Sequence, residues 1–238
     1  MSQRSLYALC LMSFFLADVR DGLGPFLGIF LTERHWRPDE IGLVMTCGGI
    51  AGLLATLPAG IAADATRHKK MIVLLGCLVI TVATLLLWYS NQTWTAMVSQ
   101  IVAGIAAAFI GPTVAGITLG LTGQRGFNHQ MGRNEAFNHG GNTSAALLAG
   151  FSAWYWGMGA VFILMTVMAI FAAFATLAIR GDEIDNEVAR GYEQNEERQP
   201  ALSLAMLMRK PALMIAGVTL LLFHLANAAL LPMLSMRV

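Results

Sequence analysis

Seven long apolar windows, separated by short polar links, run through this sequence. A helix rises about 1.5 Å per residue, so about 20 apolar residues are needed to cross the hydrocarbon core of a bilayer. Lipid offers no water to an unpaired backbone, so we expect each window to form one membrane-spanning helix. The windows are residues 5–31, 41–63, 71–89, 94–122, 136–157, 158–179 and 211–236.

Charged side chains are scarce, and half of the acidic ones are concentrated in one place. Hydrophobic residues make up 56% of the 238 residues and charged residues 12%, about half the share that is usual in soluble domains. Seven of the fourteen acidic residues lie between Asp182 and Glu197. A soluble fold of this size cannot bury so much apolar surface. We therefore predict an all-α integral membrane protein whose main partner is the lipid bilayer.

Lysine and arginine residues fall mainly on one side of the predicted membrane. Eleven of the fifteen lie on the same side as the N-terminus, and three lie on the opposite side. The positive-inside rule then places the N-terminus and the loop 180–210 in the cytoplasm, and we expect the inner (plasma) membrane of a bacterium. A cleaved signal peptide is the alternative for the N-terminus, but residues 15–17 do not form a small-x-small cleavage site.

Polarity divides the chain into three parts. Residues 1–180 are predicted to form an N-terminal bundle of six transmembrane helices, and residues 211–238 a seventh transmembrane helix. Between them, residues 181–210 are predicted to form an acidic cytoplasmic linker that acts as a solvated tether. The end of this linker, residues 201–210, is expected to be an amphipathic stretch on the membrane surface.

Three charges interrupt the first window near its centre. Asp18, Arg20 and Asp21 lie within the apolar run 5–31, where one charge costs at least about 2.5–3.5 kcal/mol on insertion scales. The two aspartates are three residues apart and share a helix face, whereas Arg20 points elsewhere. Either Arg20 bridges a polar group and holds the bundle together, or the three residues line a polar pathway in which an aspartate carries a proton. The glycines and the proline of residues 22–25 predict a kink beside them.

The start of the fifth window is unusually polar. Asn134, Asn138 and Asn142 recur every four residues and therefore lie on one stripe of a helix, with His139 beside it. These side chains either hydrogen bond to a neighbouring helix or line a cavity or gate near the cytoplasmic mouth. The imidazole of His139 can change its charge near neutral pH.

Two further polar residues, His224 and Asn227, lie three residues apart near the middle of the seventh window. Their side chains, too, either hydrogen bond to a neighbouring helix or line a cavity or gate. The histidines and the three cysteines do not group as metal ligands or as a disulfide framework, so we predict no metal. The chain has no phosphate-binding glycine-rich loop and no basic-aromatic pattern, so we predict no cofactor and no nucleic-acid partner.

The link between the second and third windows carries the most informative motif. In "PAGIAADATRHKK", Gly60 is followed four residues later by Asp64 and then by Arg67, Lys69 and Lys70. The positive-inside rule explains the basic residues but not the acid. The motif resembles the cytoplasmic loop signature of the major facilitator superfamily, although alanine follows the acid here, where a basic residue is common.

The order of the windows is also similar to this family. Six spans, a long cytoplasmic loop and a seventh span resemble the first half of its twelve-helix plan. The resemblance implies a six-helix N-terminal bundle plus one further transmembrane helix, an incomplete twelve-helix fold. It also implies that the loop motif is a conformational gate, in which the acid pairs with the loop basic residues and lies near helix ends of the opposite half. Many members carry an arginine at the position of Gln100, so this chain lacks whatever role that arginine plays in them.

The resemblance implies a secondary active transporter that moves a small solute by alternating access. We expect coupling to protons, in an antiporter that exports its substrate, because the buried carboxylates offer a proton carrier. The early end of the chain leaves three hypotheses: a truncated form or fragment of a twelve-span transporter, a chain that pairs with a second half-transporter chain, or a membrane binding or regulatory subunit that does not transport. We do not expect an enzyme, because paired catalytic aspartates normally come from separate helices.

Overall fold

The computed structural model describes residues 2–20, 23–24, 26–190 and 210–228, and these residues form helices and no strand. The chain divides into two compact units, Met1–Gln194 and Asn195–Val238. In the second unit, helix α8 spans Pro211–Ala228 and so falls within the predicted seventh window. The predicted amphipathic stretch lies outside the described residues, except for Lys210 at its end, and so does the last part of the seventh window.

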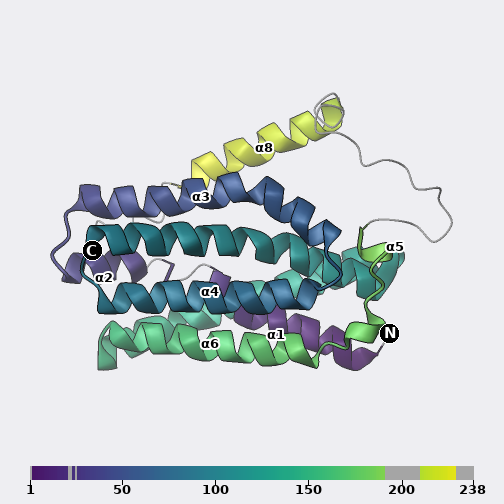
Figure 1. Cartoon of the computed structure of the whole chain (residues 1–238), viewed down its shortest axis with the longest axis horizontal. Coiled ribbons are helices and arrows are strands. Elements are labelled where there is room, and N and C mark those ends of the chain that lie inside the picture. The colour runs from purple at the N-terminus through teal and green to yellow at the C-terminus, as the bar shows by residue number, and fades with distance from the viewer. Residues whose placement is uncertain (1, 21–22, 25, 191–209, 229–238) are drawn as a thin grey trace. The chain divides into compact units, whose positions relative to one another are not determined.

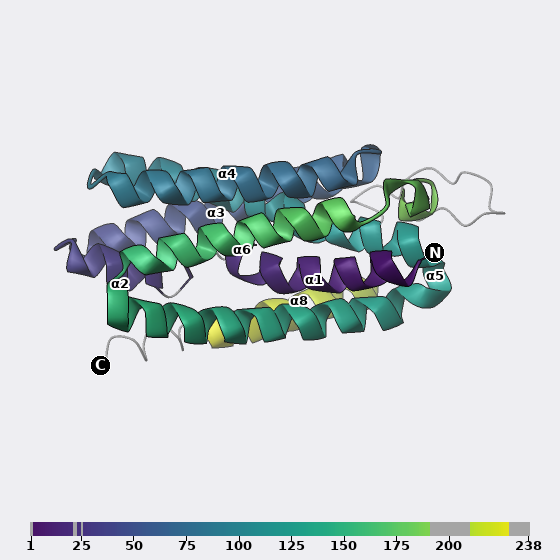
Figure 2. The same ribbon diagram turned by 90° about the horizontal axis from the view of Figure 1, so that it is seen from below.

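The first unit is a bundle of helices whose long members run side by side (Figures 1 and 2). Its helices are α1 Gln3–Arg20, α2 Phe26–Glu33, α3 Pro38–Ala65, α4 Lys69–Tyr89, α5 Thr93–Trp156 and α6 Gly159–Ala178. Two short 3-10 turns follow, η1 Gly181–Glu183 and η2 Val188–Arg190.

The run α5 consists of two helices that meet at a kink, and the chain doubles back between them (Figure 2). Gly123 has φ 65° and ψ 175°, a left-handed φ that favours glycine and interrupts the helical geometry. We call residues 93–122 the first segment of α5 and residues 124–156 the second segment. The second segment therefore begins well before the predicted fifth window, which starts at residue 136.

Four of the described helices, α3, α4, α5 and α6, are long and apolar enough to cross a membrane by length and composition. The two segments of α5, residues 93–122 and 124–156, are about 45 and 50 Å long, so each can cross a hydrocarbon core of about 30 Å once. Helix α1 has 18 residues, three of them charged, and is not among the four. Together with α2 it occupies the predicted first window, so the bundle follows the six predicted windows in order.

Glycines allow two pairs of helices to approach closely. A Cβ atom added to Gly48 of α3 would lie 3.0 Å from the carbonyl oxygen of Gln100, and one added to Gly104 would meet the carbonyl oxygen of Gly48. Similarly, a Cβ atom on Gly141 of the second segment would meet the carbonyl oxygen of Phe14 in α1. Close backbone contact of this kind is a main source of helix association in lipid, where no hydrophobic force drives helices together.

The interior of the bundle consists of two apolar clusters. One joins α1, α4, α5 and α6 through residues such as Leu9, Ile80 and Ile117, all of which are buried. The other joins α2 to the far ends of α4 and α6, where the ring centroid of Phe162 lies 4.7 Å from that of Phe30 and 5.4 Å from that of Trp88.

Arg34, between α2 and α3, caps the C-terminal end of α4. Its guanidinium donates to the carbonyl oxygens of Ser90 at 2.9 Å and Trp88 at 2.5 Å, and it lies 4.3 Å from the centroid of the Phe30 ring. The last carbonyl groups of a helix have no partner within the helix, and a cation is favoured there by the helix dipole.

We expect Arg34→Ala to lower the free energy of unfolding by about 1.5–3 kcal/mol, the usual contribution of a hydrogen bond to a charged group. Thermal unfolding of the purified chain in detergent measures this change. Arg37→Ala is the matched control, because Arg37 is exposed and its ion pair among the described residues is with exposed Asp39. Equal losses in the two variants would contradict the proposed cap.

Candidate functional site

The first span is broken next to its charged residues. Helix α1 ends at Arg20 and α2 begins at Phe26, and Gly24 between them has φ +49°. The predicted kink is thus present as a break between two helices. Arg20 is exposed at the end of α1, whereas Asp21, with Gly22 and the proline of the same stretch, lies outside the described residues.

Asp18 and Asn142 lie at the same level of two neighbouring helices. Ala17 of α1 packs against Gly141 of the second segment of α5, where an added Cβ atom would lie 3.1 Å from the Ala17 Cβ. Asp18 and Asn142 are the next residues along the two helices, and both are half-buried. Two predicted site residues from different windows therefore each follow a residue of this crossing.

The asparagine stripe divides into a buried part and a half-buried part. Asn134 is 2% exposed; its Oδ1 accepts a hydrogen bond from Gln130 Nε2 at 2.8 Å, and its Nδ2 donates to Thr118 Oγ1 at 3.0 Å. The Cys10 thiol of α1 contacts both amides, at 3.2 Å from Gln130 Nε2 and 3.7 Å from Asn134 Oδ1. This buried network ties α1 to both segments of α5, so Asn134 holds the bundle together.

The predicted pathway residues beyond Asn134 are less enclosed. Asn138 and Asn142 are half-buried and His139 is exposed. Glu135 is also exposed, and it lies four residues before His139, on the same side of the helix. The sequence interpretation missed both Glu135 and Gln130, because they fall in a polar stretch before the predicted fifth window. Their spacing of four from His139 and Asn134 would have revealed them.

The exposed faces of the bundle differ in polarity. On α4 and α6 the exposed large side chains are apolar, as at Leu75, Leu86 and Phe174, which is the surface that lipid tolerates. The second segment of α5 exposes Leu147 and Phe151 towards its end, but Glu135 and His139 are exposed near its start. The start of this segment is therefore chemically unlike a lipid-facing surface.

The predicted gate residues lie at the end of α3, in the loop 66–68 and at the start of α4. Lys69 is 1% exposed, and its Nζ donates to the carbonyl oxygens of Ala63 at 2.5 Å and Thr66 at 3.1 Å. Lys70 Nζ donates to the carbonyl oxygens of Leu177, at 3.2 Å, and Ile179 at the end of α6. The loop lysines therefore cap helix ends, which the dipole favours.

The remaining gate residues face outward. Asp64 and Arg67 are exposed, and Arg67 Nη2 lies 4.0 Å from Glu187 Oε1. Within the described part of the chain, no ion pair joins the Asp64 carboxylate to the basic residues of its own loop. A Cβ atom added to Gly60 would meet nothing within 4 Å.

The start of the acidic linker packs on the bundle, although the sequence predicts a solvated tether there. Ile184 and Ala189 are buried, at 9% and 3% exposed. Glu183 Oε2 accepts hydrogen bonds from the Ser2 N–H at 3.0 Å and the Ser2 hydroxyl at 2.9 Å. These bonds, with the Ser5 hydroxyl and Arg180, hold the pKa of Glu183 below its ordinary value of 4.5.

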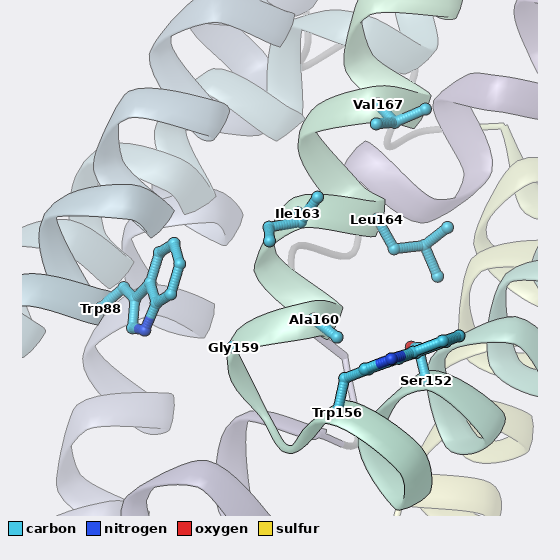
Figure 3. A pocket seen from close by; sticks show the side chains of 8 residues that line it. All are labelled: Trp88, Ser152, Trp156, Gly159, Ala160, Ile163, Leu164 and Val167. Carbon is cyan, nitrogen blue, oxygen red and sulfur yellow. The ribbon is translucent and has the colours of Figure 1, made fainter.

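A cavity of about 610 Å³ lies at the other end of the bundle, between α4, α6 and the end of α5. Figure 3 shows Trp88 and Trp156 on either side of the start of α6. Its other lining residues are Ser152, Gly159, Ala160, Ile163, Leu164 and Val167. None of the eight is ionisable, so this cavity suits an apolar group and is separate from the charged residues of α1.

The second unit holds two of the predicted pathway residues. His224 and Asn227 fall in α8, and their side chains lie outside what the structure describes. The two pathway residues of the predicted seventh window therefore stay predictions.

A bundle of apolar helices with a broken first span and a basic loop between its second and third passes defines an all-α integral membrane protein. Its sequence profile identifies the family: the profile of the Major Facilitator Superfamily matches residues 9–237, and the chain belongs to that superfamily.

Individual relatives agree with this assignment. An uncharacterized MFS-type transporter of Mycobacterium tuberculosis, found in two strains, is 41% identical over 229 residues, which cover 95% of this chain and 55% of the relative. Multidrug resistance protein 2 of Bacillus subtilis is 25% identical over 186 residues, 78% of this chain and 46% of that protein. The chain thus spans about half the length of the curated relatives it matches.

Proposed function

We propose that this chain acts in secondary active transport, moving a small solute across the membrane by alternating access. The main support is the charged residues of the first span, which lie beside a polar helix face in an otherwise apolar bundle. Ionisable groups inside a membrane protein are costly and usually mark a substrate or ion pathway. Asp18, Arg20, Asp21, Asn138, His139 and Asn142 are the proposed pathway residues, with Glu135 added from the structure.

Protons are the proposed coupling ion, and export the proposed direction. Aspartate carboxylates at the pathway can bind and release a proton. The name of the Bacillus subtilis relative, a multidrug resistance protein, supports a small organic molecule as the substrate. The bias of basic residues supports an inner (plasma) membrane location with a cytoplasmic N-terminus.

The loop residues Gly60, Asp64, Arg67, Lys69 and Lys70 are proposed to form the conformational gate. Lys69 and Lys70 bind carbonyl oxygens of α3 and α6, so a change in the relative position of these helices must break contacts of the loop. Contacts that are broken and remade in this way suit a switch between two states.

Reconstitution tests the proposed transport directly. The purified chain is placed in proteoliposomes, and the accumulation of lipophilic organic cations is measured with an imposed pH gradient and after a protonophore collapses it. We expect accumulation that depends on the gradient. Binding without accumulation in either condition would contradict transport by this chain and would favour a binding or regulatory role.

A further inference from the structure

The residues that follow α6 fold back onto the end of the bundle that carries the α3–α4 loop. We call residues 181–190 the linker clip. The Asp185 N–H donates to the carbonyl oxygen of Gly120 at 3.0 Å. A Cβ atom on Gly120 would lie 2.8 Å from the Asp185 carbonyl oxygen and 2.9 Å from the Ile184 side chain. The clip can dock here only because residue 120 has no side chain.

Arg190 ends the clip and binds the end of α3. Its Nε donates to the carbonyl oxygen of Asp64 at 3.0 Å, and its Nη2 donates to that of Ala65 at 2.7 Å. Helix α3 ends at Ala65, so no backbone N–H of the helix can donate a hydrogen bond to these two carbonyl groups. The planar guanidinium presents its donors in a rigid fork, whereas the donors of a lysine all rotate about one nitrogen.

Glu187 places a negative charge between two arginines. Its Oε1 lies 3.8 Å from Arg190 Nη1 and 4.0 Å from Arg67 Nη2. Arg67 belongs to the gate loop, so the clip contacts this loop through a charge as well as through carbonyl caps. These side chains are partly exposed, and the charge contacts are individually weak.

Lys69 fills the space between the gate loop and the clip. Its Cδ and Cε would each lie 3.2 Å from a Cβ atom on Gly116, and the carbonyl oxygen of Ala189 would lie 3.7 Å from the same position. The Lys69 side chain is therefore enclosed by α3, the first segment of α5 and η2. The clip and the loop can separate only if Arg190 gives up its carbonyl partners, Asp64 and Ala65.

We propose that Arg190 and Glu187 are positioning residues of the gate, and that the linker clip holds the α3–α4 loop in the arrangement seen here. The clip must release the loop before the loop takes up its other arrangement. In the present arrangement Arg190 binds the carbonyl oxygen of Asp64 and leaves the Asp64 carboxylate exposed. This inference rests on the proposed transport function for its role, but the docking itself can be measured without transport.

Labelling of a cysteine beneath the clip tests the docking. Ile184→Cys places a thiol at a buried position, and cysteine is smaller than isoleucine, so the site is not overfilled. A maleimide reagent labels this thiol in the purified full chain in detergent, and the chain without the added cysteine gives the background from its three native cysteines. Labelling requires the clip to open.

We expect Arg190→Ala to raise the labelling rate about tenfold, the factor that losing a hydrogen bond to a charged group typically gives. Arg190→Lys should give a smaller rise. Lys69→Ala should also raise the rate, because it removes the buried side chain that fills the space beside Gly116 and Ala189 beneath the clip. Arg180→Ala is the matched control: Arg180 lies just before the clip, and its ion pairs among the described residues are with Asp182 and Glu183 and do not reach the gate loop. Such pairs of a half-exposed arginine are weak, so the variant should change the rate less than about twofold.

Three results would overturn the proposal: an unchanged rate in Arg190→Ala, an equal rise in Arg180→Ala, or an unchanged rate in Lys69→Ala. Gel filtration of each variant shows whether a rise reflects global unfolding; if Arg190→Ala does not fold, the Arg190→Lys result decides. Absence of solute accumulation by the parent chain would contradict the proposed function, whereas the labelling rates would still decide whether the clip holds the loop.

Discussion

Replacing Gly141 by alanine is expected to lower the free energy of unfolding by about 1–3 kcal/mol or more, the range for overfilling a close-packed interior. The added Cβ atom would meet the carbonyl oxygen of Phe14 and lie 3.1 Å from the Ala17 Cβ. The first of these is a backbone atom of α1 and cannot rotate away. Helix α1 must therefore move from the second segment of α5, and the neighbouring hydrogen bonds of the buried Gln130–Asn134 network must stretch with it.

Gly150→Ala is the control for this prediction, because Gly150 lies on the same helical segment and a Cβ atom there would meet nothing within 4 Å. Alanine is a better helix former than glycine by about 0.8–1.0 kcal/mol, so this variant should be as stable as the parent or more stable. Thermal unfolding in detergent, followed by tryptophan fluorescence, compares the two. A stable Gly141→Ala variant would contradict the close crossing of α1 and α5.

The order of helices was predictable from hydropathy. Exposing a polar group to lipid costs free energy at every position of a span, so each span appears in the sequence as a long apolar run. The predicted windows 41–63 and 71–89 lie within α3 and α4, which begin only slightly earlier, at Pro38 and Lys69. Some local features also follow directly from residue type. Proline is favoured at the start of a helix, as at Pro38, and glycine at a sharp reversal, as at Gly123.

The fifth helix begins before the predicted window because hydropathy does not register a helix that continues beyond the hydrocarbon. Residues 124–135 are mostly polar, yet they are helical. The side chains of Gln130 and Asn134 hydrogen bond to each other there, and also to Cys10 and Thr118. Such a network depends on a three-dimensional arrangement of helices, which spacing along one helix cannot specify.

The linker clip was not predictable for a related reason. Its composition is that of a solvated linker, and its fixed contacts are made largely with backbone atoms. Arg190 bonds to carbonyl oxygens 125 and 126 positions earlier in the chain, and a carbonyl group is present at every residue. The sequence shows that residue 190 is a cation, but it does not show which helix end this cation caps.

Neutralising Asp18 is expected to remove the dependence of solute accumulation on the pH gradient. Asp18 is half-buried beside the crossing of α1 and α5, next to the break in the first span and at the level of Asn142. If its carboxylate carries the proton, Asp18→Asn keeps the shape of the side chain and removes the carrier. We expect accumulation to fall by about 5–150-fold, the range of typical coupling between two sites, in proteoliposomes with an imposed gradient.

The design of this experiment separates coupling from folding. Asp39→Asn is the matched control, since Asp39 is an exposed aspartate at the start of α3 that pairs with exposed Arg37 at 2.7 Å. This variant should transport like the parent.

Asp21→Asn is measured in parallel, because either aspartate of the first span could carry the proton. A folded Asp18→Asn variant that loses the gradient response but still exchanges solute downhill would identify Asp18 as the carrier. An unchanged gradient response in both Asp18→Asn and Asp21→Asn would rule out proton coupling through these carboxylates, and the charges would then serve to hold the broken first span in place.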